Sequence, residues 1–179
     1  MAVTMEKDFR KAALLEVARR MVIAARTAPK GRGTDNLSLA IVEGDDIRRI
    51  ADRMKEMQEQ GRAGSFFVRD ADNLLQSDVV VLIGTKIEPL GLPNCGLCGF
   101  KDCDEKREYP LVPCMFNASD LGTATGSAVA VAADSRVDNR IMFSAGMAVR
   151  ELEMLGEETQ IIYGIPLSCT GKSPFFDRK

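Results

Sequence analysis

The chain has 179 residues, of which 45% are hydrophobic and 28% charged, and its formal net charge is −2. This length fits one domain, and the nearly balanced charge argues against nucleic acid as a partner. The absence of histidine excludes Ser-His-Asp and Cys-His catalysis, together with every zinc site that needs imidazole.

The first part of the chain predicts a helix, a loop and a strand. Apolar residues recur at helical spacing over residues 5–26, and proline and glycine then break the chain into a loop over residues 28–36. Leu37, Leu39 and Ile41 alternate with neighbours that face the other way, which predicts a strand.

The next segments predict two helices and a buried strand. Acidic residues open an amphipathic helix at Asp45, and Gly61 is expected to end it. A shorter helix is expected over residues 70–77. The continuous apolar run within residues 78–84 is typical of a strand that is buried on both faces.

The last part of the chain predicts two more helices and a final strand. Residues 119–133 are rich in glycine and alanine, so we expect a helix that lets neighbouring backbones come close and lies buried at the centre of the protein. An amphipathic helix over residues 141–155 and a strand over residues 159–165 follow, and Pro166 is expected to end that strand. The order of elements predicts an α+β fold with a central, mostly antiparallel sheet wrapped by helices.

A cysteine-rich segment over residues 89–114 is expected to be an insert in this single domain of residues 1–179. Four of the five cysteines lie in it, with the spacing C-x2-C-x4-C-x10-C. Anionic sulfurs repel one another, so this grouping predicts an occupant: an iron–sulfur cluster, a zinc ion or two disulfides. The four candidate metal ligands are Cys95, Cys98, Cys103 and Cys114.

The spacing favours an iron–sulfur cluster, and we expect the 4Fe–4S type. Four-cysteine zinc sites usually combine two C-x2-C knuckles, and this chain has one, although zinc remains open as an alternative. The N-terminus shows no apolar signal segment, so a cytoplasmic location is expected, and a reducing cytosol argues against structural disulfides. Cys169 is expected to be incidental, and the mixed-charge run over residues 102–108 to be solvated.

The cysteine segment carries a family resemblance. Asn94–Cys103, followed by Pro113 and Cys114, resembles the short 4Fe–4S domain of corrinoid iron–sulfur proteins and anaerobic electron-transfer subunits. The whole chain also resembles a family of uncharacterised ferredoxin-domain proteins from anaerobic bacteria and archaea. That family is similar in outline to the flavin-dependent nitroreductases.

Three stretches carry the nitroreductase resemblance: Ala25–Pro29 with Asn36, Asp120–Ala124, and Ile161–Leu167 with the tail behind it. The resemblance implies FMN as a second cofactor and a homodimer supported by the helix over residues 119–133; a monomer that buries this helix internally stays open. The implied FMN contacts are Arg26, Lys30, Arg32, Asn36, Lys172 and Arg178.

The leading hypothesis is therefore an iron–sulfur redox protein, in its fuller form an FMN- and 4Fe–4S-dependent oxidoreductase. It would exchange electrons with a redox partner protein or a small-molecule acceptor. The alternative is a non-catalytic protein whose four-cysteine zinc site is structural and mediates partner or dimer contacts. No membrane span is expected, because the weakly polar stretch over residues 115–133 contains too many polar side chains.

Overall fold

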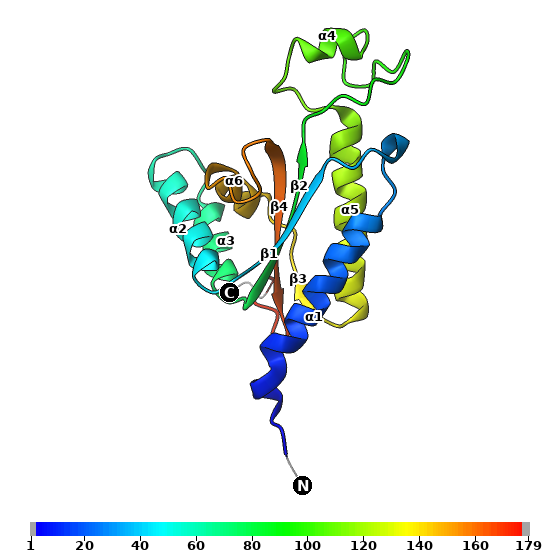
Figure 1. The fold of residues 1–179 in the computed structure, drawn as a ribbon. Coiled ribbons are helices and arrows are strands. Elements are labelled where there is room, and N and C mark those ends of the chain that lie inside the picture. Colours follow the sequence, from blue (N-terminus) through cyan, green and yellow to red (C-terminus); the bar gives the residue numbers. More distant parts are fainter. Residues whose placement is uncertain (1–2, 177–179) are drawn as a thin grey trace.

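A four-stranded sheet forms the middle layer of the protein (Figure 1). The structure is a computed structural model and describes residues 3–176. The strands lie in the order β1-β2-β4-β3 and every neighbouring pair is antiparallel, so the predicted α+β class with an antiparallel sheet is confirmed. They are β1 (Leu37–Glu43), β2 (Val79–Lys86), β3 (Asp138–Asn139) and β4 (Thr159–Ser168).

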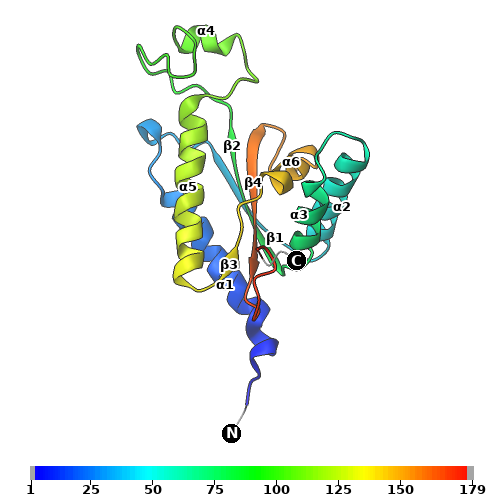
Figure 2. The same ribbon diagram turned by 180° about the vertical axis from the view of Figure 1, so that it is seen from behind.

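Helices cover both faces of the sheet, and each face has its own hydrophobic core (Figure 2). One face packs against α1 (Glu6–Thr27) and α5 (Met115–Asp134). The opposite face packs against α2 (Asp45–Glu59), α3 (Phe66–Leu74) and α6 (Phe143–Glu151). The strand β2 is fully buried along most of its length because it lies between β1 and β4 with helices on both sides, as its apolar run predicts.

The chain leaves these layers between β2 and α5. Residues 87–114 form the insert, which contains the short helix α4 (Cys103–Arg107) and projects beyond the sheet at one end of α5 (Figure 1). The start of α1 lies at the opposite end of the molecule. The insert is therefore attached to the three layers through the end of β2 and the first turn of α5.

Several predicted bounds were wrong. β4 continues through Pro166 to Ser168; the proline is tolerated because β3 pairs with β4 only at residues 167 and 168, and the neighbouring bridge lies at Gly164. α6 ends at Glu151, well before the predicted end at residue 155. The helices α3 and α5 each begin four residues earlier than expected, and α4 and β3 were not anticipated.

The helix α5 is not buried internally, which corrects the expectation for residues 119–133. Its inner face packs on α1 and the sheet, where Leu121, Ala124 and Ala128 are buried. Its outer face is exposed and carries mainly small residues, among them Gly122 and Gly126. Within residues 3–176 no helix is both long enough and apolar enough to cross a membrane.

The close packing of α6 on β4 at Gly146 can be tested by substitution. A Cβ atom added at Gly146 would lie 1.7 Å from the carbonyl oxygen of Ile162, and this contact is with backbone that has little freedom to move. We expect Gly146→Ala to lower the free energy of unfolding by about 3 kcal/mol or more, measured by urea denaturation. Met147→Ala, at the exposed neighbouring position, should change it by about 0.5 kcal/mol at most. Equal stability of Gly146→Ala and the wild type would contradict this packing.

Candidate metal centre

The insert brings the four predicted cysteine ligands to one place. Cys95, Cys98, Cys103 and Cys114 all line a single hollow, together with apolar side chains that include Leu90. Cys114 is buried, and the other three are partly exposed. Residues up to 19 positions apart in the sequence thus line the same hollow, which their spacing alone does not guarantee.

The first two cysteines are placed by a tight turn. Gly96 and Gly99 have φ angles of 59° and 86°, and the amide of Gly99 donates a hydrogen bond of 3.0 Å to the carbonyl oxygen of Gly96. Only glycine adopts such angles without a steric cost, so the two glycines allow the chain to fold back between Cys95 and Cys98. The predicted role of these glycines is consistent with this geometry.

The third cysteine is placed by a helix cap. Cys103 is the first residue of α4, and Asp102 is its N-cap: one carboxylate oxygen accepts hydrogen bonds from the amides of Asp104 and Glu105, at 3.1 and 2.9 Å. These two backbone hydrogen bonds lower the pKa of Asp102 below its ordinary value. The cap fixes where α4 begins and hence where Cys103 lies.

The fourth cysteine joins the insert to the protein core. Cys114 is the N-cap residue of α5 and is 5% exposed. In the first turn of the same helix, the side-chain oxygen of Asn117 accepts a hydrogen bond of 2.8 Å from the amide of Glu88, which follows β2. The beginning and the end of the insert are therefore tied to each other at the start of α5.

A lysine side chain is buried beside the cysteines. Lys106 is 1% exposed and lines the same hollow, whereas the charge run over residues 102–108 was predicted to be solvated. That prediction was wrong for Lys106 because α4 turns this one side chain inward. Its neighbours Asp104, Glu105 and Arg107 are exposed, as predicted.

The side chains around the hollow are chemically suited to an anionic metal group. Four sulfur atoms and one cation surround the hollow, and all five cysteines are free thiols. In the part of the chain that the structure describes, no three His, Cys, Asp or Glu side chains stand close enough together to hold a single metal ion. Cys169 lies outside the hollow, and burial raises the pKa of its thiol.

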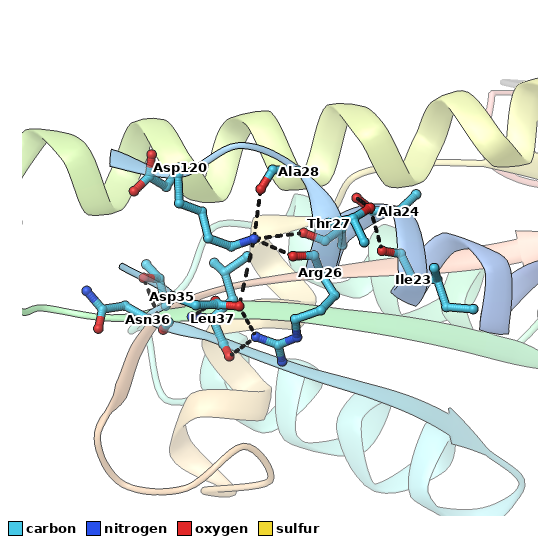
Figure 3. Close-up of polar contacts among 12 residues, drawn as sticks. Ile23, Ala24, Arg26, Thr27, Ala28, Asp35, Asn36, Leu37 and Asp120 are labelled. Carbon is cyan, nitrogen blue, oxygen red and sulfur yellow. Dashed lines mark hydrogen bonds and ion pairs between the residues drawn. The ribbon is translucent and has the colours of Figure 1, made fainter. Parts of the chain in front are cut away.

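The loop over residues 28–36, predicted to approach FMN, is held by bonds within the chain (Figure 3). The Lys30 ammonium donates to the carbonyl oxygens of Arg26 and Ala28, at 2.6 and 2.9 Å, and so caps the end of α1. The Arg26 guanidinium pairs with the carboxylate of Asp35 at 2.7 Å. Both cations therefore already have oxygen partners.

Two further contacts of this loop connect it with α5 and with the insert. The amide of Gly31 donates to both carboxylate oxygens of Asp120, at 3.0 and 3.1 Å, so an internal anion occupies this backbone donor. The Arg32 guanidinium donates to the carbonyl oxygen of Leu90 at 2.8 Å. Arg32 therefore ties the loop to the first part of the insert.

The remaining predicted FMN contacts lie apart from these bonds. The side-chain nitrogen of Asn36 is buried and has no hydrogen-bond partner among the described residues. Lys172 belongs to the segment after β4, and Arg178 lies outside the described residues. Of the predicted contacts, Asn36 is thus the one whose donor is buried and unsatisfied.

Known structures place this architecture in a recognised class. A nitroreductase family protein from Clostridium novyi NT has a TM-score of 0.60 and 13% identity, over 94% of this chain and 76% of that protein. An FMN-bound nitroreductase from Desulfitobacterium hafniense has a TM-score of 0.61 and 12% identity, over 88% and 78%. At these identities the likeness concerns the fold alone, and the protein has a nitroreductase-like fold with a cysteine-rich insert.

The sequence comparisons identify the family. The chain is 41% identical to an uncharacterized protein of Archaeoglobus fulgidus, over 97% of this chain and 96% of the relative. The profile described as "Uncharacterized protein containing a ferredoxin domain (DUF2148)" matches residues 112–178, a range that includes Cys114. The protein belongs to this family of ferredoxin-domain proteins, as the resemblance predicted, and the membership supports a redox role.

Two contributors to the site were missed from the sequence. Lys106 lies three residues after Cys103, a spacing that puts both on one side of a helical turn, but α4 itself was not predicted. Asp120 was assigned to the helix that supports a dimer, and its bond to Gly31 joins positions 89 residues apart. No local pattern indicates such a contact.

The ion pair of Asp35 in the loop over residues 28–36 can be tested by its dependence on pH. Partial burial disfavours ionisation of Asp35, but hydrogen bonds from Arg26 and the Leu37 amide outweigh it and hold the pKa of Asp35 below its ordinary value. The stabilisation is therefore present above pH 3.9 or so and is lost as the pH falls through the lowered pKa. We expect Asp35→Asn to lower the free energy of unfolding by about 1 kcal/mol at pH 7, measured by urea denaturation.

The difference between Asp35→Asn and the wild type should shrink as the pH falls from 5 toward 3 or so. Asp45→Asn is the control, because the Asp45 carboxylate is fully exposed and its 3.8 Å pair with Arg48 contributes little. A difference at Asp35 that stays constant over this pH range would rule out the ion pair as its cause.

Proposed function

We propose that this protein is an iron–sulfur redox protein in which Cys95, Cys98, Cys103 and Cys114 hold a 4Fe–4S cluster. The observation that carries the proposal is the convergence of these four thiols on one hollow beside a buried lysine. The bound cluster would supply one-electron transfer. Residues 89–114, within the insert, are the binding segment, carried by an otherwise continuous α+β domain.

The chain's own residues hold and shield this site. The glycine turn directs the first two cysteines inward, the Asp102 cap positions the third, and α5 positions the fourth. Leu90 and Phe116 form apolar parts of the lining of the hollow, and an apolar lining influences the reduction potential of a cluster. The cysteine spacing and the ferredoxin-domain family both support iron–sulfur over zinc.

A redox partner protein would dock on the projecting insert. The insert and the residue that follows it carry five exposed large apolar side chains within a short stretch of the chain. A partner that buries them would come close to the cysteine hollow and so shorten the distance for electron transfer. These side chains are Leu97, Tyr109, Leu111, Val112 and Met115.

A homodimer would bury the outer face of α5. This face carries Gly122 and Gly126, and a Cβ at either position would meet no atom within 4 Å in the single chain. Small residues let two helices approach closely, so a second α5 is the fitting neighbour. A dimer would also account for the glycine content of a helix that its own chain leaves half exposed.

FMN is not needed for the proposed electron transfer, and we derive no step through it. The cations Arg26, Lys30 and Arg32 bind oxygens of the chain, and Asp120 occupies the Gly31 amide. The loop as folded therefore does not offer a free phosphate site. Nitroreductase-type activity would require the loop to rearrange.

The assignment of the cysteine ligands can be tested by metal analysis. Protein purified without oxygen should contain iron and acid-labile sulfide, and Cys98→Ser should lose most of both because one cluster ligand is removed. Iron, sulfide and zinc are measured on the same sample. Cys169→Ser is the matched control: it removes a thiol outside the hollow and should retain the wild-type content.

Zinc at about one per chain without sulfide would replace the redox proposal with the structural zinc alternative. Unchanged iron in Cys98→Ser would show that the ligand assignment is wrong. Work without oxygen is essential, because exposed thiols and clusters oxidise in air.

The oligomeric state and the flavin content can be tested in one measurement. Native mass spectrometry of the anaerobic protein should give the mass of two chains with their clusters and without FMN, because the loop cations are engaged internally. Gly122→Leu should shift the protein to a monomer, since a large side chain blocks close helix contact. FMN at about one per chain would show that the loop opens on binding, and a wild-type monomer would contradict the dimer proposal.

A further inference from the structure

The buried lysine of the insert has no counter-charge in the protein itself. No carboxylate in residues 3–176 forms an ion pair with Lys106, and its ammonium makes no hydrogen bond within that range. The neighbouring charges are used elsewhere: Arg107 pairs with Asp104, and Glu105 accepts from the Lys101 amide at 2.6 Å. A buried ammonium without a partner is unfavourable, so this position calls for an anion.

The hollow offers one kind of anion to this lysine. Asp102 also lines it, but one of its carboxylate oxygens caps α4 through two backbone amides. The other lining side chains that can carry a negative charge are those of the four cysteines. Cys103 and Lys106 are three residues apart in α4 and therefore lie on the same side of the helical turn.

We propose that Lys106 is the counter-cation of the bound cluster, a positioning residue that strengthens cluster retention and raises the reduction potential. The inference rests on the proposed iron–sulfur function. Four thiolates outweigh the positive charge of the iron–sulfide core, so the bound group is anionic. One-electron reduction adds one further negative charge, and a nearby cation therefore favours the reduced state more than the oxidised state.

The effect should be large because Lys106 is only 1% exposed, so that solvent screens its charge weakly. A surface cation is screened by solvent and salt, and a cation on a buried side chain is screened less. Removing the charge should lower the reduced-to-oxidised ratio at a fixed potential by about tenfold or more. For a one-electron couple this corresponds to a shift of about 59 mV toward lower potential.

The experiment compares four proteins under anaerobic conditions: the wild type, Lys106→Met, Lys106→Arg and Lys101→Met. A dithionite titration followed by electron paramagnetic resonance gives the midpoint potential, and chelator challenge gives the rate of iron loss. Lys106→Met should show the lower potential and faster iron loss. Lys106→Arg should restore both toward wild type, and Lys101→Met should resemble wild type because Lys101 is exposed.

The iron-free protein provides a second measurement, in which removing the charge of Lys106 should have the opposite effect. Without the anionic group, the buried ammonium is a cost, so iron-free Lys106→Met should resist urea and limited proteolysis at least as well as the iron-free wild type. A purely structural lysine would behave otherwise, because its loss would weaken the iron-free and iron-loaded proteins alike. If Lys106→Met weakens the iron-free and the iron-loaded protein alike, or leaves the reduction potential unchanged, the proposal is overturned.

The outcomes separate this inference from the function on which it rests. If the anaerobic wild type contains no iron and sulfide, both the proposed function and the proposed role of Lys106 are wrong. A wild type with a normal cluster, combined with an unaltered Lys106→Met, removes only the role of Lys106. If Lys106→Met holds too little cluster to titrate, retention in Lys106→Arg supports the proposal and loss in both variants contradicts it.

Discussion

Four cysteine side chains and one lysine side chain line a hollow that the insert forms at the end of α5, and their charged forms are unfavourable neighbours when nothing lies between them. Thiolates repel one another, and a buried cation without an anion is costly. The proposed anionic metal–sulfur group would meet both requirements at once, since it would bind the thiolates and compensate the charge of the lysine. The apolar walls of the hollow strengthen each of these electrostatic effects.

The layered part of the protein holds the insert in place through contacts at both of its ends. Asn117 and Cys114 lie in the first turn of α5 and at its cap, and they hold the two ends of the insert together. Arg32 reaches the insert from the loop after α1, and Asp120 fixes that loop on α5. Arg32, which the resemblance assigned to FMN, thus holds the cysteine segment against the loop after α1.

The sequence predicts those features that depend on local pattern. The apolar run of β2, the alternation in β1 and the helical spacing of α1 all follow from neighbours along the chain, and the structure confirms each of them. The cysteine spacing likewise led to the four residues that line the hollow. The resemblance of the whole chain to the ferredoxin-domain family is confirmed as well.

The features that were missed depend on contacts between distant segments. Pro166 remains in β4 because β3 happens not to pair beside it, and the register of that edge is not a local property. Lys106 belongs to a charged run that a solvated surface would explain equally well, and only the folding of the insert turns it inward. The loop cations bind carbonyl and carboxylate oxygens whose positions follow from the ends of α1 and β1.

The central claim is that the insert binds a redox-active iron–sulfur cluster, and Mössbauer spectroscopy tests it most directly. Protein produced with iron-57 and kept free of oxygen should show sulfur-coordinated iron at about four atoms per chain, in a spectrum that changes on reduction. Absence of sulfur-coordinated iron from protein with all four thiols intact would contradict the account.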